Sequence, residues 1–359
     1  MHVRHYGICV SSALFAVTLL SQSAMAGNIS GFAQTNLVSD IDGMAPVTDP
    51  NLKNPWGVSF TSTSPFWVSD QVTGVATLYN TTGVKQALTV AMPNSASPTG
   101  TVSNSTSSFN SDLFLFATLS GTITGWRPSL NTTAETLFIA PAGTVYTGLT
   151  SATVNNVPLL YAADTSNGKI DVYNNSGKTT LAGNFNDPTL PSGFSPYNVQ
   201  NIGGSIYVTY APNTGSGGFV DVFDLNGNFL KRLIANNGLD SPWGITVAPA
   251  GFGTLGGDFL IGNEDQGIIN VFDPNGNPVG TLAGNGGPIT NTGLWTLTFG
   301  NGGMGGNPGS LYITAGINDE KDGLFARIDA VPEPGTFSLL AVAALAAMVV
   351  RIAPRFRRE

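Results

Sequence analysis

The run GVATLYN, which begins at Gly74, is the first of six short stretches in which a glycine opens an alternating apolar segment and a large apolar residue stands five positions later. The other five are GTITGWR from Gly121, GKIDVYN from Gly168, GFVDVFD from Gly218, GIINVFD from Gly267 and GLFARID from Gly323. Successive glycines are 47, 47, 50, 49 and 56 residues apart. A regular period of this size is typical of a repeat architecture.

Each repeat contains two earlier landmarks in the same order. The first is a start segment, usually a proline or aromatic residue next to a glycine: Pro55-Trp56-Gly57, Pro98-Thr99-Gly100, Tyr146-Thr147-Gly148, Pro196-Tyr197-Asn198, Pro242-Trp243-Gly244 and Leu294-Trp295-Thr296. The second is a short strand rich in aromatic and β-branched residues: Phe66 to Asp70, Leu113 to Leu119, Leu159 to Asp164, Ser205 to Tyr210, Asp258 to Asn263 and Ser310 to Ala315. Glycine, asparagine, aspartate and proline bound these runs, as expected for strands joined by turns.

A fourth strand follows a tight turn, most clearly after Asn226-Gly227 and Asn275-Gly276. Asn-Gly is typical of a type I′ hairpin turn, in which both residues have positive φ. Each repeat therefore predicts a four-stranded antiparallel blade, and six repeats predict an all-β, six-bladed β-propeller. The last repeat runs into Pro332 without room for a fourth strand, so we expect the segment FAQTNLV from Phe32 to Val38 to supply it and close the ring.

The N-terminus has the pattern of a secretory signal peptide over residues 1–26. Arg4 and His5 precede an apolar stretch, and Ala24 and Ala26 stand before the expected cleavage point at Gly27. The propeller is thus predicted to span residues 27–331 of an exported protein. The segment 1–26 also holds Cys9 and both histidines, His2 and His5.

Without that segment the chain has no cysteine or histidine, which excludes disulfides, thiol nucleophiles, Ser-His-Asp triads and histidine-ligated zinc or copper. Charged residues make up only 10 % of the chain, against a usual ~25 %. Residues 27–334 carry nine basic and 21 acidic side chains, and 9 − 21 = −12. Nucleic acid is an unsuitable partner for such a surface because phosphates are repelled by it.

Residues 332–359 contain a motif, Pro332-Glu333-Pro334, then an apolar stretch from Phe337 to Val350 and four arginines, Arg351, Arg355, Arg357 and Arg358. This arrangement resembles the PEP-CTERM sorting signal of Gram-negative bacteria that make exopolysaccharide. The resemblance implies a C-terminal transmembrane helix in the inner membrane, a processing enzyme of the exosortase type, and delivery to the cell surface or extracellular matrix. A plain membrane anchor that is never processed is the alternative.

Other parts of the chain carry weaker resemblances. DPNLKNPWG from Asp49 and PFWVSDQVTGVATLYN from Pro65 resemble the opening of an uncharacterised family of secreted bacterial proteins, and VFDPNGNPVGTLAG from Val271 is similar to the end of an NHL-type propeller repeat. The first family implies no activity.

Loops between the second and third strands of propeller blades gather around one end of the central channel, so their polar residues are expected to converge. Here they contain Asp70, Asp164, Asn263, Glu264, Asp265, Asp319 and Glu320. Carboxylate and amide oxygens suit Ca²⁺. Equally, Asp and Asn are good turn residues that bond to their own backbone.

Two functions follow as hypotheses. The first is a binding or structural module that meets exopolysaccharide or another surface protein, since the usual catalytic groups are absent. The second rests on similarity to gluconolactonase-like propellers, which implies a calcium-dependent hydrolase with Asn263 and Asp164 as ligands and Glu264 or Asp265 as the base. The tryptophans at equivalent positions, Trp56, Trp243 and Trp295, are more consistent with packing between blades than with stacking on sugars.

Overall fold

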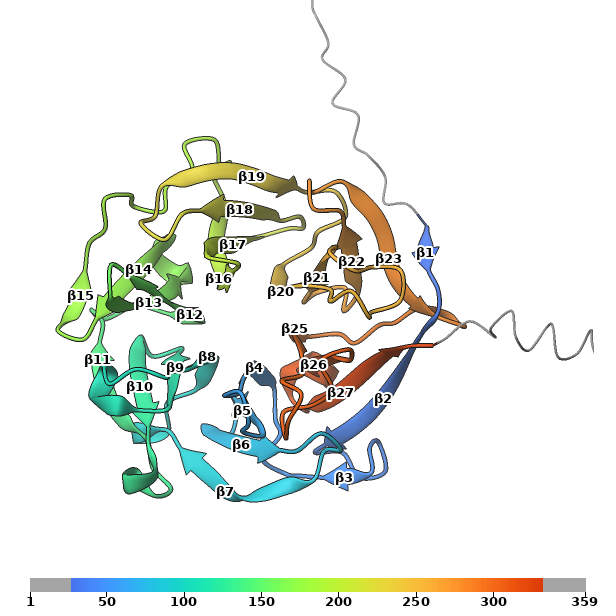
Figure 1. Ribbon diagram of the computed structural model, residues 1–359, viewed down its shortest axis with the longest axis horizontal. Coiled ribbons are helices and arrows are strands. Elements are labelled where there is room, and N and C mark those ends of the chain that lie inside the picture. The colour runs from blue at the N-terminus through green and yellow to red at the C-terminus, as the bar shows by residue number, and fades with distance from the viewer. Residues whose placement is uncertain (1–26, 332–359) are drawn as a thin grey trace, which may run out of the picture.

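The computed structural model describes residues 27–331, whose strands form six antiparallel sheets placed as blades around a central channel (Figure 1). From the channel outward, blade one contains β4 (Pro55–Ser59), β5 (Phe66–Asp70), β6 (Val75–Tyr79) and β7 (Lys85–Ala91). Blade two contains β8 (Pro98–Ser103), β9 (Phe114–Thr118), β10 (Thr122–Trp126) and β11 (Glu135–Ile139). Blade three contains β12 (Tyr146–Val154), β13 (Val157–Asp164), β14 (Lys169–Asn174) and β15 (Gly177–Thr179). Blades four and five are β16 (Phe194–Ile202), β17 (Ser205–Pro212), β18 (Phe219–Phe223) and β19 (Phe229–Ala235); and β20 (Pro242–Val247), β21 (Phe259–Asn263), β22 (Ile269–Phe272) and β23 (Pro278–Gly284). The predicted six-bladed propeller of four-stranded blades is confirmed.

Blade six joins the two ends of the described chain. Its strands from the channel outward are β25 (Leu294–Phe299), β26 (Leu311–Ala315), β27 (Leu324–Ala330) and β2 (Phe32–Ser39). Strand β2 pairs antiparallel with β27, with Phe32 opposite Ala330, so the predicted closure by the N-terminal strand is confirmed. Three two-residue strands extend the outer edges: β1 (Asn28–Ile29) and β24 (Gly287–Pro288) on β23, and β3 (Val47–Thr48) on β2.

The two Asn-Gly turns differ from the expected type I′ geometry. Only the glycines have positive φ, 80° at Gly227 and 83° at Gly276, whereas neither asparagine does. The Gly227 N–H donates to the Asp224 carbonyl at 3.0 Å, and the Asp224 carboxylate accepts from the N–H groups of Asn226 and Asn228. These are type I turns closed by a left-handed glycine, and the preceding aspartate decides the geometry because it satisfies the turn amides.

The start segments have a common structural role at the wall of the channel. In all six blades the pairing of the first and second strands shifts by a β-bulge at this position. There the innermost strands of neighbouring blades touch: a Cβ on Gly100 would collide with the backbone of Leu149, and one on Gly57 with the backbone of Thr99. The recurring glycine is therefore a requirement of close backbone approach.

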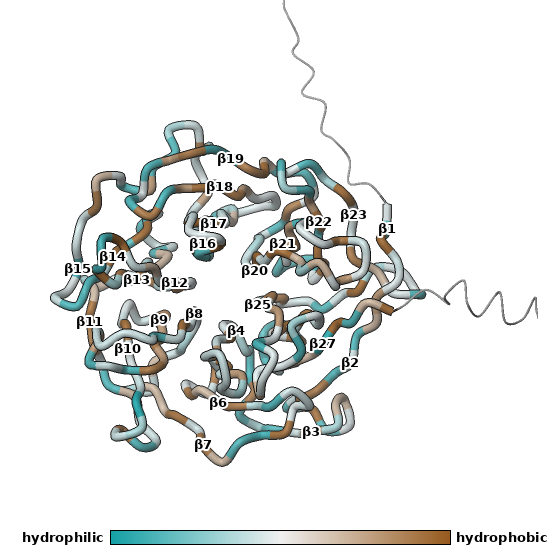
Figure 2. Tube along the Cα trace, viewed as in Figure 1, coloured by the Kyte–Doolittle hydropathy of each residue, from teal (hydrophilic) through white to brown (hydrophobic). Residues whose placement is uncertain are grey.

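Apolar side chains fill the space between blades, and hydrophobic residues recur along the strands of each blade (Figure 2). A separate aromatic layer crosses the channel. Trp56, Trp243 and Trp295 are at most 5 % exposed, and the rings of Trp56 and Trp295 stack at 3.6 Å. Tyr197 takes the same place in blade four and packs edge-on against Trp56 and Trp295. The tryptophans are core residues, as predicted.

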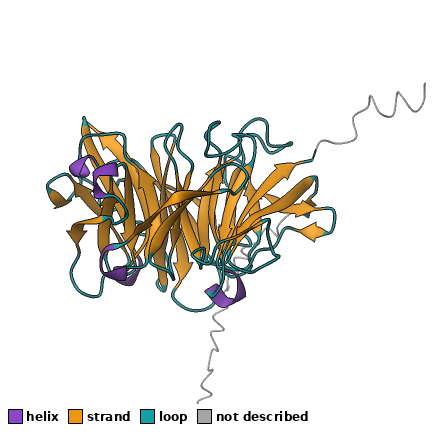
Figure 3. Cartoon of the chain, turned by 90° about the horizontal axis from the view of Figure 1, so that it is seen from below, coloured by secondary structure: helices purple, strands orange, loops and turns teal. Residues whose placement is uncertain are grey.

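Within residues 27–331, helical structure is limited to single turns near the two faces of the disc (Figure 3). They are η1 (Pro93–Ser95), η2 (Phe109–Ser111), η3 (Pro128–Leu130), η4 (Thr165–Asn167) and α1 (Ile317–Glu320). Within residues 27–331 there is no helix with the length and apolar character needed to cross a membrane.

For residues 27–331 the predicted fold class is corrected to an all-β propeller, because no transmembrane helix is found in that range. The signal peptide and the sorting motif, including Pro332, Glu333 and Pro334, lie outside the described residues.

Adding one methyl group at the channel wall tests whether close backbone approach explains the repeated glycine. Gly100→Ala is expected to lower the free energy of unfolding by about 1–3 kcal/mol or more, because the backbone of the next blade must move. Gly286→Ala is the matched control, since a Cβ there meets no atom within 4 Å. Urea unfolding of both variants gives the comparison, and equal midpoints would contradict the explanation.

Candidate functional site

All six innermost strands run in the same direction along the channel, so each end of the channel has its own set of residues. The first strand of a blade begins where the second ends: Pro55 lies opposite Asp70, and Pro242 opposite Asn263. The loops between second and third strands therefore gather at the end where the inner strands begin, as expected. The aromatic layer lies one residue further along these strands.

Glu264, Asp265 and Glu320 meet at this end of the channel, which we call the acidic mouth. Together with Thr292, Gly293 and the α1 turn they line a pocket of about 490 Å³ between blades five and six. No basic side chain lines the pocket. Asp265 is anchored by the Ser241 hydroxyl, which donates to its Oδ2 at 2.7 Å.

Glu264 is the most perturbed acid at this mouth. Burial, together with the nearby carboxyls of Asp265, Glu320 and Asp240, raises its pKa to about 8, because a second negative charge is unfavourable beside them. Glu264 therefore carries a proton at neutral pH. A carboxyl held in this state can donate a hydrogen bond or a proton, which an ordinary surface glutamate cannot do.

Glu320 is held in place from blade one. The Asn54 side chain donates from Nδ2 to Glu320 Oε2 at 2.8 Å, and its Oδ1 accepts from Trp295 Nε1 at 2.8 Å. Asn54 is fully buried. Burial raises the pKa of Glu320, and the bond from Asn54 partly offsets this. The acidic mouth is thus fixed to the aromatic layer beneath it.

Tyr197 adds a hydroxyl from blade four. The hydroxyl makes no hydrogen bond to any other described residue. Burial raises the pKa of Tyr197, and the charges of Glu264, Glu320 and Asp265 add to the effect. Three blades therefore direct polar groups to one point. From the sequence alone this role was missed because Tyr197 occupies the position at which other blades have a core tryptophan. The feature that could have revealed it is the tyrosine hydroxyl, which tryptophan lacks.

The remaining candidate ligands are engaged elsewhere. Asp164 accepts hydrogen bonds from Ser166 and from the backbone and side chain of Asn167, within its own turn. The Asn263 Oδ1 accepts from the Asp240 N–H at 2.9 Å. Asp70 is buried inside blade one, where its Oδ2 accepts from the Thr77 hydroxyl at 2.7 Å. The turn-residue interpretation therefore accounts for Asp164, whereas Asn263 binds the backbone of a separate loop. Asp319 has 93 % of its side chain exposed at the edge of the acidic mouth.

The fit of these residues to calcium is poor. Among residues 27–331, no three or more Asp, Glu, His or Cys side chains are grouped as the ligands of a metal ion. The predicted ring of oxygen ligands does not form as a whole, because Asp70 and Asp164 are engaged within their own blades and only the acids of blades five and six converge.

Two other perturbed carboxyls belong to ion pairs within blades. Burial raises the pKa of Asp112 to about 6 and that of Asp221 to about 7. Asp112 is bound by Arg127 at 2.8 Å and Asp221 by Arg232 at 2.9 Å. Because their partners are structural arginines, neither carboxyl marks a second site.

The chain resembles three uncharacterized proteins of Acanthamoeba polyphaga mimivirus. It is 31 % identical to protein R648, over 64 % of each chain, and 30 % identical to protein L690, over 64 % of this chain and 68 % of that protein. It is 30 % identical to protein R640 over 44 % of this chain and 32 % of that protein. The chain belongs to the family of L690. It spans 64 % of the length of R648, and no family model matches it.

Solved structures share the fold at much lower identity. A streptogramin B lyase is 12 % identical with a TM-score of 0.53, over 83 % of this chain and 97 % of that one. A putative gluconolactonase is 12 % identical with a TM-score of 0.55, over 84 % and 93 %, and a calcium-binding protein, regucalcin from Agrobacterium tumefaciens, is 13 % identical with a TM-score of 0.54, over 86 % and 98 %. At this identity the likeness concerns the fold alone. Neither these proteins nor the mimivirus relatives support the resemblance to a bacterial sorting signal.

The protonation of Glu264 has a consequence for stability. Its folded pKa of about 8 exceeds the ordinary 4.5, so the folded state keeps a proton that the unfolded chain has already released. The contribution of Glu264 to the free energy of unfolding is fully present below about pH 4.5 and is lost as the pH rises to about 8. Glu264→Gln should remove this loss. Above pH 8 the free energy of unfolding of the variant should exceed that of the wild type by roughly 1–3 kcal/mol. Unfolding free energies between pH 5 and 9 test this, with the exposed Asp319→Asn as control; parallel curves for Glu264→Gln and the wild type would contradict the raised pKa.

Proposed function

We propose that this protein is a binding module whose acidic mouth accepts an organic ammonium group, such as a lysine side chain on another surface protein. The observation that supports it best is the convergence of Glu264, Asp265 and Glu320 in one pocket that no basic side chain lines. The Tyr197 hydroxyl, which has no partner among the described residues, supplies a further acceptor. An ammonium group offers three donors and a charge that matches this set.

Protonation makes the binding depend on pH. An incoming ammonium group stabilises the charged form of Glu264, so the carboxyl loses its proton when the ligand binds. Affinity should therefore increase as the pH rises toward and through 8, while the lysine amine, with its ordinary pKa of about 10.4, stays charged. Asn54 keeps Glu320 in position for this contact.

We also propose that the protein acts outside the cytoplasm, because residues 1–26 have the composition of a signal peptide. A propeller whose residues 27–331 contain no cysteine can act in that compartment through its loops. Its partner would be a surface component that presents amines.

Calorimetry with Nα-acetyl-lysine amide as the probe tests the main proposal, with the Nζ-acetylated analogue as the uncharged control. The charged probe should bind more tightly at pH 9 than at pH 7 and release a proton on binding. Glu264→Gln should weaken binding about tenfold and remove its pH dependence, since the charge of one contact is lost. Asp42→Asn, at an exposed carboxyl that does not line the pocket, should leave binding unchanged. Equal affinity for both analogues, or none for either, would contradict the proposal.

A second candidate function is hydrolysis of an ester or lactone without a metal, which the raised pKa of Glu264 favours. Asp265 would take a proton from the attacking water, and Glu264 would donate its proton to the leaving alkoxide, so that a hydroxy acid is formed. A screen with δ-gluconolactone and aryl acetates, followed by proton release, tests this. Activity should fall about 100-fold or more in Glu264→Gln and persist in EDTA; an unchanged rate in the variant would exclude this role.

A further inference from the structure

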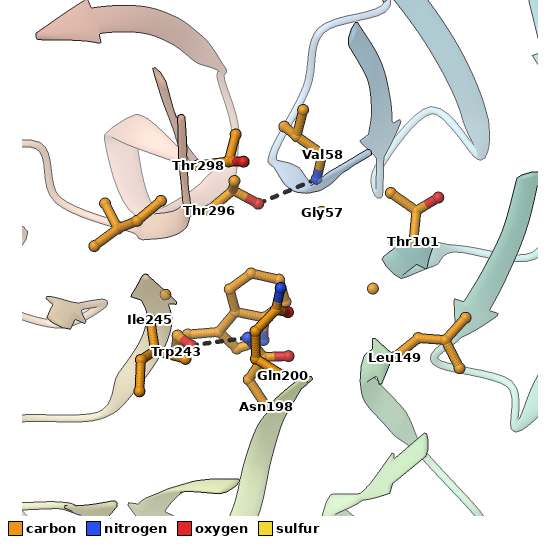
Figure 4. A pocket seen from close by; sticks show the side chains of 13 residues that line it. Gly57, Val58, Thr101, Leu149, Asn198, Gln200, Trp243, Ile245, Thr296 and Thr298 are labelled. Carbon is orange, nitrogen blue, oxygen red and sulfur yellow. Dashed lines mark hydrogen bonds between the residues drawn. The ribbon is translucent and has the colours of Figure 1, made fainter. Parts of the chain in front are cut away.

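The opposite end of the channel has a different chemistry from the acidic mouth. Beyond the aromatic layer the inner strands continue through Val58, Thr101 and Gln200, which line the channel below Trp243 (Figure 4). The channel then opens into a pocket of about 310 Å³. We call this end, lined by Ser59, Phe60, Ser103, Ser151 and Gln200, the neutral mouth.

The polar groups at the neutral mouth are free to bind a ligand. Among the described residues, the side chains of Ser59, Ser103, Ser151 and Gln200 make no hydrogen bonds, although each is partly buried. By contrast, Thr101 and Asn201 are already engaged with the backbones of Leu115 and Ser151. Figure 4 shows the Gln200 side chain within the channel, beside Asn198 and Trp243. The polar atoms of Gln200 and the three serines remain accessible to solvent and are therefore available to a ligand.

No charged side chain lines this pocket. A charged ligand would lose its hydration there without gaining a counterion, which is costly. The occupant that suits the site is therefore neutral and rich in hydrogen-bonding groups.

Phe60 adds an apolar surface beside these groups. It is partly exposed, and its other side packs edge-on against Phe66 at 5.6 Å. An aromatic ring next to several hydroxyl and amide groups matches the two faces of a sugar ring, one apolar and one polar. The buried tryptophans, in contrast, offer no such surface.

We propose that the neutral mouth binds an uncharged sugar, with Phe60 against the apolar face of the ring and Gln200 and the three serines as hydrogen-bond partners. The pocket volume lies at the lower end of the about 300–1,000 Å³ found for ligand sites, which suits one terminal sugar unit of a glycan. This site is separate from the acidic mouth because the aromatic layer lies between them. The sugar site and the proposed ammonium site can therefore be tested separately.

Saturation-transfer NMR with the protein and neutral probes tests the proposal: glucose, galactose, mannose and their β1,4-linked disaccharides, with glucuronic acid as the charged control. At least one neutral probe should receive saturation, and glucuronic acid should not. Gln200→Leu, which keeps the side-chain size, and Phe60→Ala should each weaken binding of that probe about tenfold. Glu264→Gln, at the other mouth, should leave it unchanged.

Three results would overturn the proposal: no transfer to any neutral sugar at millimolar concentration, equal transfer to glucuronic acid, or undiminished binding in both Gln200→Leu and Phe60→Ala. Because Phe60 contacts the core residue Phe66, its substitution can affect stability. Gln200→Leu avoids this difficulty, since Gln200 has no side-chain hydrogen bond to lose within the described part of the chain.

Discussion

The close approach of neighbouring inner strands is the constraint on which the rest of this propeller depends. At the start of each blade a β-bulge brings the backbone against the next blade, and glycine occupies the point of contact in four of the six blades, at Gly57, Gly100, Gly148 and Gly244. Tryptophan precedes this glycine in two blades, at Trp56 and Trp243, and Trp295 takes the equivalent place before Thr296 in blade six. The same short motif therefore sets the width of the channel and places an aromatic layer across it.

That layer gives the channel two ends with different chemistry. Asn54 and Trp295 connect the layer to Glu320 on one side, while Trp243 borders the neutral, hydroxyl-lined space on the other. Because the layer is buried and tightly stacked, the carboxyls of one mouth do not influence the polar groups of the other. A rigid disc with loops at both faces can in this way carry two independent binding sites (Figure 3).

The sequence predicted the fold well because its signals were local and repeated. The strand from Phe66 to Asp70 was placed within its true bounds, and the closing strand from Phe32 followed from the missing fourth strand of the last repeat. The Asn-Gly turns were assigned the wrong type because the side chain of an aspartate two residues before each asparagine, Asp224 and Asp273, binds the turn amides. The site was harder to predict. Glu264, Asp265 and Glu320 were among the candidates, but whether a loop carboxylate faces the channel or its own turn, as Asp164 does, depends on packing between blades that no local pattern records.

The most direct test of this account is a crystal structure of the protein grown with both Nα-acetyl-lysine amide and the neutral sugar that binds best. The account predicts the ammonium group beside Glu264, Glu320 and Tyr197, and the sugar ring against Phe60 and Gln200, with the stacked tryptophans unmoved between them. Both ligands at one mouth, or an aromatic layer displaced by either ligand, would contradict the division of the channel into two independent sites.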